Sequence, residues 1–207
     1  METDEQTLEE IKKWWKEHGR TVIAGVVLGL GTVIGWTTWK SHQEAKAEEL
    51  SLRYQALVDT AAQENRTDAM LLADAIIADQ PESSYAALSA LVAAHSAFKN
   101  KDLNRARDYL QWAVDNATAF KVSDVARVRL ARVLSAQGDH DAALQQLDQV
   151  TDAAFTVLTA EARGDVLGAK QDREGARAAY EGALASEDID AGARERIRLK
   201  IDVLARG

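Results

Sequence analysis

The sequence contains no cysteine, a single proline and few aromatic residues. Without cysteine the chain has no disulfide, no thiolate nucleophile and no Cys-ligated zinc or iron–sulfur site. One proline in 207 residues and 6% aromatic residues are unusual for a β-rich domain. They are typical of helices, which favour alanine, leucine, arginine, glutamine and glutamate. These absences predict an all-α protein.

The sequence also lacks catalytic motifs and an excess of basic residues. It has no GxSxG, HExxH or Walker A motif, and none of its four histidines pairs with a second ligand at metal-binding spacing. Asp139-His140-Asp141 suggests acid–base chemistry, but its place at a repeat turn favours Asp139 as a helix cap. The net charge of −8 disfavours nucleic acid. We predict a non-enzymatic protein with no catalytic residue, cofactor or metal, and an envelope hydrolase is only a weak alternative.

One long uncharged run stands out. Between Arg20 and Lys40 the chain has 19 residues without a charge, and four of the five tryptophans flank it. As a helix the run would extend roughly 28 Å, close to the hydrocarbon thickness of a bilayer. Tryptophan prefers the boundary between lipid and water. The sequence predicts a transmembrane signal anchor over residues 21–39, in contact with the lipid bilayer; a cleaved signal peptide is the less favoured alternative.

Four glycines recur within this run at four-residue spacing. Gly25 and Gly29 form one pair, and Gly31 and Gly35 form another. Small residues at this spacing allow a second transmembrane helix to approach closely. The sequence therefore predicts a helix-packing face, although glycine is also common in membrane helices that make no such contact.

The residues on either side of the run define the predicted domains. Residues 1–20 are interpreted as a cytoplasmic amphipathic tail, with a short helix on the membrane surface that ends at Gly19; a disordered tail is the alternative. Four Lys/Arg residues precede the run and three follow it, which weakly favours a cytoplasmic N-terminus. Residues 40–207 are predicted to form one soluble domain beyond the span.

The first part of that domain is predicted to be a degenerate helix pair. Apolar residues recur at helical spacing over residues 41–64, and Asn65-Arg66-Thr67 interrupts the pattern. We expect Thr67 to cap a second helix that ends near residue 78. Pro81 then marks a stop, with Ser83 or Ser84 at the start of the next helix.

A pattern then repeats three times along the chain. Asp102, Asp139 and Asp172 lie 37 and 33 residues apart; each is followed after three residues by alanine and, four residues later, by a large apolar residue. An apolar-periodic helix precedes each of them. This period matches the tetratricopeptide repeat (TPR), two antiparallel helices in about 34 residues. The sequence predicts a TPR-like α-solenoid, closed by a capping helix over residues 191–205.

The last repeat is the clearest, and its small residues explain how its helices are expected to pack. Small side chains are needed where the two helices cross, and larger ones fill the space between neighbouring repeats. The predicted packing residues are Gly164, Leu167, Ala176, Tyr180 and Ala183.

A solenoid of this kind binds peptides or partner helices on its surface. Arg127, Arg129 and Arg132 lie close together on one predicted helix and could hold an acidic partner. A solvated charged face is the favoured interpretation of these three residues. His95, in an alanine-rich helix, is interpreted as an interior or groove residue.

Several strings of residues, spread over nearly the whole chain, are characteristic when taken together. They are Gly25 to Gly31, Ile34-Gly35-Trp36, Trp39, Ser41-His42-Gln43, Tyr85 to Leu88, Arg129 to Val133, Arg163-Gly164-Asp165 and Gly175-Ala176-Arg177. With these strings the chain resembles the YfgM family, whose members are ancillary subunits of the bacterial SecYEG translocon. The string in the apolar run is the most specific part of the resemblance.

The resemblance implies a type II inner-membrane protein with a cytoplasmic N-terminus and a periplasmic TPR-like domain. It also implies association with SecYEG and with the membrane-anchored periplasmic chaperone PpiD, and assistance to newly exported client proteins. An alternative function is a membrane-anchored regulator that sequesters a stress-response protein, such as a cytoplasmic response regulator. No individual functional residue follows from the resemblance.

Overall fold

The structure is a computed structural model that describes residues 2–206, and all of their side chains except those of residues 2–11, 21–24, 26–28, 31 and 120. These residues form α-helices and one short 3-10 helix, and they contain no strand. The elements are α1 (Glu2–Ala62), α2 (Arg66–Asp79), α3 (Ser84–Lys99), α4 (Leu103–Asn116), α5 (Phe120–Ala136), α6 (His140–Asp148), η1 (Ala153–Phe155), α7 (Thr156–Ala169), α8 (Arg173–Leu184) and α9 (Ala191–Arg206).

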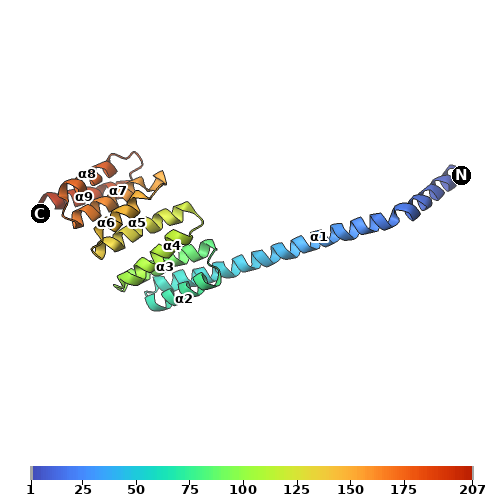
Figure 1. The fold of residues 1–207 in the computed structure, drawn as a ribbon, viewed down its shortest axis with the longest axis horizontal. Coiled ribbons are helices and arrows are strands. Elements are labelled where there is room, and N and C mark those ends of the chain that lie inside the picture. Colours follow the sequence, from blue (N-terminus) through green and yellow to red (C-terminus); the bar gives the residue numbers. More distant parts are fainter. Residues whose placement is uncertain (1, 207) are drawn as a thin grey trace. The chain divides into compact units, whose positions relative to one another are not determined.

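The chain divides into two units, Met1–Glu49 and Leu50–Gly207. In the second unit, helices that are neighbours in sequence are also neighbours in space, from α2 to α9 (Figure 1). Helices α3 and α4, α5 and α6, and α7 and α8 form successive pairs, each joined by a short turn. The all-helical, TPR-like part of the fold prediction agrees with this architecture, as does the capping helix. The boundaries predicted at residues 20 and 39 stay a prediction.

Alanine dominates the interior of the repeat unit. Helix α3 buries Ala90, Ala93 and Ala97 completely, and the helices around it bury further alanines. A methyl side chain lets two helix axes approach closely and costs little conformational entropy. Larger residues, such as Leu110 and Leu130, fill the space between these close contacts. The core is therefore a series of close helix–helix interfaces, here called seams, rather than one large apolar centre.

The predicted transmembrane helix over residues 21–39 is corrected by the structure. No helix in the described part of the chain is long and apolar enough to cross a membrane. The described side chains of this run belong mainly to glycine, threonine and tryptophan, with only three aliphatic ones, so their mean hydropathy is low. The side chains at residues 21–24, 26–28 and 31, on which the prediction also relied, lie outside the described residues.

Two predicted helix ends are wrong. The helix does not end at Gly19, since α1 continues through this residue. The Trp15 ring covers Gly19, and a Cβ added there would be only 3.3 Å from the ring atoms. Thr67 does not cap α2, which begins one residue earlier with Asn65 in the capping position. Ser83 does cap α3, since its hydroxyl oxygen accepts a hydrogen bond from the Ala86 amide at 3.1 Å.

The same turn joins the helices of each repeat. The residue before each repeated aspartate has a positive φ: 62° at Lys101, 89° at Gly138 and 68° at Gln171. The aspartate amide then donates to a carbonyl five residues back, as in a Schellman motif, and its carboxylate caps the next helix. Asp139 is therefore a helix cap, as predicted. Each repeat turn consists of a residue with positive φ followed directly by a capping aspartate.

We expect Gly138→Ala to lower the free energy of unfolding by about 1 kcal/mol, because a Cβ disfavours the left-handed conformation even where space is open. Gly182→Ala is the matched control, since Gly182 lies inside α8 with open space around it and alanine favours a helix. Urea denaturation of both variants measures the difference. Equal effects of the two substitutions would show that the turn conformation does not limit stability.

Candidate protein-binding site

A cavity of about 250 Å³ opens where helices α3, α4 and α5 meet. Its floor is apolar, and three of its lining side chains are basic. The volume is below the roughly 300–1,000 Å³ that is usual for small-molecule sites, and it suits one or two side chains of a bound protein. The lining residues are Ala94, His95, Phe98, Leu110, Arg129, Arg132 and Val133.

The exposed side chains of the cavity lie one helical turn apart on each of two helices. His95 and Phe98 are three residues apart on α3, and Arg129 and Arg132 are three apart on α5, so each pair shares a helix face. The opposite sides of both helices are held in the core by buried residues such as Leu130. Phe98 keeps 44% of its surface exposed, which is unusual for a large aromatic side chain. The rigid core therefore presents two basic groups beside an open aromatic ring.

The charges around the cavity are all positive. Partial burial lowers the pKa of His95, and nearby Lys99, Arg129 and Arg66 lower it further. Burial also lowers the pKa of Arg129, with a second contribution from Arg132. No carboxylate of the described chain forms an ion pair with either arginine. Arg129 and Arg132 therefore lie side by side at the cavity without a carboxylate partner in the described residues.

Arg127, the third arginine of the predicted cluster, has a different role. Its guanidinium donates hydrogen bonds to the side-chain carbonyls of Gln146 at 3.3 Å and Gln149 at 2.6 Å, which ties α5 to α6. The structure thus separates the three arginines: one supports the repeat and two line the cavity. His95 lies at the cavity, in agreement with its interpretation as a groove residue.

A second cavity, of about 370 Å³, lies between α2 and α4 and has its charges paired internally. The Tyr109 hydroxyl donates to Asp74 at 2.7 Å, and Arg105 donates to the same carboxylate at 3.3 Å. Burial and the hydrogen bond to Asp74 raise the pKa of Tyr109 to about 12. Because these polar groups already have partners, this cavity is a weaker candidate for binding.

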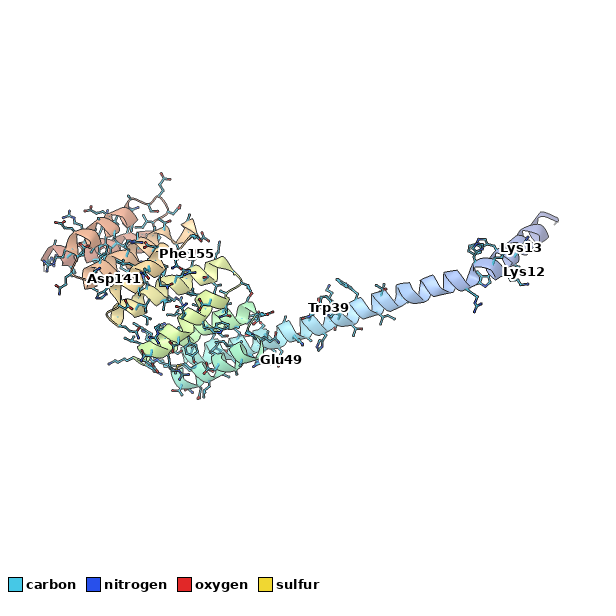
Figure 2. The ribbon with its side chains drawn as sticks, viewed as in Figure 1. Lys12, Lys13, Trp39, Glu49, Asp141 and Phe155 are labelled. Carbon is cyan, nitrogen blue, oxygen red and sulfur yellow. The ribbon has the colours of Figure 1, made fainter. Side chains whose placement is uncertain are left out.

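The described residues hold no group of three histidines, aspartates or glutamates that could bind a metal ion. In the Asp139-His140-Asp141 cluster, Asp139 caps α6 and Asp141, which is labelled in Figure 2, forms an ion pair with Lys170 at 2.6 Å. His140 contacts the Ser135 hydroxyl through Nδ1 at 3.1 Å. Each member of the cluster therefore has a structural partner.

The predicted packing residues of the last repeat lie together. A Cβ added at Gly164 would be only 2.3 Å from the Tyr180 ring, so the ring packs directly on the α7 backbone. Ala176 and Ala183 are completely buried in the same cluster, and Leu167 packs against it. Their contribution to repeat packing stays a prediction, which substitution of Gly164 tests.

The four glycines of the apolar run lie in α1. A Cβ at Gly25, Gly29 or Gly35 would meet nothing within 4 Å, and the side-chain surroundings of residue 31 lie outside the described residues. The described residues do not test the predicted helix-packing role of Gly25, Gly29, Gly31 and Gly35, which stays a prediction.

Sequence reasoning missed a buried charge that holds the last helix in place. Glu161 of α7 is 2% exposed and accepts two hydrogen bonds from Arg196, at 2.8 and 2.7 Å, and one from Lys200 at 2.8 Å. Lys200 also contacts Asp165, which accepts a hydrogen bond from Tyr180. The partners are 35 and 39 residues away in sequence, so no local pattern could have indicated this network.

These features define a class of protein: a TPR-type helical-repeat protein with an open, basic and apolar surface site. A family profile described as "Tetratricopeptide repeat-like domain" matches residues 12–206.

Curated relatives match over nearly the whole chain. The "Ancillary SecYEG translocon subunit" of Escherichia coli K12 is 33% identical over 99% of this chain and 98% of its own length. The protein of the same name from Aggregatibacter actinomycetemcomitans is 31% identical over 97% of this chain and 97% of its own length. The one from Haemophilus influenzae is 29% identical over 88% of this chain and 89% of its own length. The chain belongs to this TPR-like family, which confirms the resemblance found in the sequence.

Gly164→Ala is expected to lower the free energy of unfolding by about 2 kcal/mol, because the Tyr180 ring must move and its hydroxyl is held by Asp165. Gly168→Ala in the same helix is the control, since its nearest atoms are at 3.9 Å. Thermal and urea unfolding measure both. A Gly164 variant as stable as the Gly168 variant would contradict the close packing.

The ion network predicts a dependence of stability on pH. The hydrogen bonds from Arg196, and then those from Lys200, outweigh burial and lower the pKa of Glu161 to about 2. A lowered pKa stabilises the fold above the unfolded value of about 4.3, and this contribution disappears as the pH falls towards 2. Glu161→Gln should therefore cost about 3 kcal/mol at pH 7 and roughly half as much at pH 3.

Urea denaturation at both pH values measures this difference. Glu181→Gln is the control, because Glu181 forms an exposed ion pair with Arg177 within one helix and should contribute little at either pH. A Glu161→Gln effect that is small at pH 7, or equal at the two pH values, would exclude the network as the source of stability.

Proposed function

We propose that this protein is a non-enzymatic ancillary subunit of the Sec translocon that binds other proteins through its repeat domain. The observation that carries the proposal is the match, over nearly the full length of both chains, to the Escherichia coli relative named as such a subunit. The helical-repeat fold supports it, because stacked helices offer a surface for partners rather than a catalytic centre.

Within that function, we propose that the repeat domain works on the periplasmic side of the inner membrane. There it scaffolds a membrane-anchored chaperone such as PpiD and assists newly exported proteins. The family resemblance supports this part of the proposal. An alkaline-phosphatase fusion at the C-terminus should be active if the domain lies outside the cytoplasm, and an inactive fusion that accumulates normally would contradict this location.

Photocrosslinking in cells tests the proposal itself. A photoreactive amino acid replaces Phe98 at the cavity or, as a control, Leu71 of α2, which is similarly exposed at 60%. Position 98 should crosslink to a translocon subunit, a periplasmic chaperone or an exported protein, identified by mass spectrometry. Crosslinks formed at position 71 show which proteins contact any exposed side chain of the domain, whether or not it lies at the cavity.

Two results would overturn the proposal. One is the failure of any translocon subunit to copurify or crosslink with the full-length chain in mild detergent. The other is the recovery of a cytoplasmic response regulator as the main partner, which would favour the regulatory alternative.

A further inference from the structure

We propose that the cavity between α3 and α5 binds a segment of a partner protein in which a carboxylate side chain stands next to a large apolar side chain. The inference deepens the proposed function, because it assumes that the partner is a protein. It assigns the two parts of the cavity to two chemical groups: Arg129 and Arg132 to the carboxylate, and Phe98 with the apolar floor to the neighbouring side chain.

The charge of the site selects an anion. Several arginines of the same domain have carboxylate partners, whereas no carboxylate of the described chain forms an ion pair with Arg129 or Arg132, which lie next to each other. A guanidinium binds a carboxylate through charge-assisted hydrogen bonds, which are stronger than neutral ones. The arginines with carboxylate partners are Arg53 with Asp79, Arg66 with Glu64, Arg105 with Asp74, Arg107 with Asp108, Arg163 with Asp148, Arg177 with Glu181 and Arg196 with Glu161.

The local field strengthens this selection. Arg129 and Arg132 repel each other, and every charge that perturbs His95 is a cation, on α2, α3 or α5. Of these cations, Arg66 already has a carboxylate partner in Glu64 at 3.4 Å, so the unpaired charges at the cavity are those of Arg129 and Arg132. An incoming carboxylate relieves the repulsion between these two guanidinium groups, whose helix is fixed by its buried residues.

The apolar part of the site selects the second group. Leu110 and Val133 are buried at the floor and Ala94 adds a methyl group, so this part of the cavity surface forms no hydrogen bonds with water. Phe98 stands at the edge with its ring half exposed, and aromatic side chains of this kind are frequent anchors of protein interfaces. A bound leucine or phenylalanine side chain would cover the floor and the ring together.

The size and the layout favour a peptide segment over a small molecule. The volume of about 250 Å³ accommodates one or two side chains, and it is open to solvent, so the rest of the segment can continue across the domain surface. Acidic and apolar side chains close together in one segment satisfy both halves of the cavity. The cavity between α2 and α4 lacks this selectivity, because its arginine already binds Asp74.

The experiment measures binding of a fluorescein-labelled peptide, in which glutamate alternates with phenylalanine and leucine, to the purified full-length chain by fluorescence anisotropy. We expect saturable binding that weakens about tenfold in the Arg129→Gln/Arg132→Gln variant and several-fold in Phe98→Ala. Binding should also weaken with added salt. Peptides with glutamine for glutamate, or alanine for the large apolar residues, should bind about tenfold more weakly.

Matched variants separate a local effect from charge or folding. Arg198→Gln/Arg206→Gln removes two exposed charges from α9 and should leave binding unchanged. Arg129→Lys/Arg132→Lys keeps the charge and should restore part of the affinity. Circular dichroism and thermal unfolding confirm that the variants remain folded.

The results distinguish this inference from the proposed function, because the assay contains no translocon. Peptide binding without any crosslink to the translocon would uphold the site and overturn the proposed function. Absence of saturable binding, equal binding of the glutamine peptide, or an equal loss in the α9 control would overturn the site whatever the crosslinking shows.

Discussion

The close approach of neighbouring helices is the constraint on which the rest of the repeat domain depends. Alanine occupies the seams, as at Ala93, Ala97 and Ala113, and a glycine does so where the Tyr180 ring lies on α7. Because these seams are narrow, each helix is held by its neighbours in sequence, and the turn between them must be tight. The positive φ and the capping aspartate at each repeat turn meet this requirement, since they reverse the chain and satisfy the helix ends at once.

The same packing explains where the candidate site lies. Small side chains on α3 place its backbone close to α4 and α5, and the larger His95 and Phe98 side chains are left at the edge of the seam. Two arginines from α5 stand beside them. At the C-terminal end of the domain, α9 packs on α8 through its buried Ala193 and Ile197. The buried Glu161 of α7 adds ion pairs with Arg196 and Lys200 of α9, so apolar packing and charge together hold the last helix.

The repeat pattern was predictable from the sequence because its signals are local. The aspartate and alanine spacing predicted the pairs α3–α4, α5–α6 and α7–α8, and Asp139 was identified as a cap. Predictions that relied on single residues were less reliable. Gly19 did not end a helix, and Asn65 rather than Thr67 stands at the start of α2, because helix ends depend on neighbouring side chains such as Trp15 as well as on residue type. The span over residues 21–39 was predicted from the length of an uncharged run and from the tryptophans beside it, and no helix of the described residues is long and apolar enough to support it.

The sequence by itself determined the helical class, the repeat period and the family, since each follows from residue types at fixed spacing along one chain. Only the tertiary structure decided which charged groups meet. Arg127, Arg129 and Arg132 look equivalent in the sequence, yet one binds the glutamines of α6 and two face a cavity. Glu161 and Lys200 are 39 residues apart and form the most buried ion pair of the described chain. The reason is physical: local spacing sets which side of a helix a residue occupies, but packing sets what that side faces.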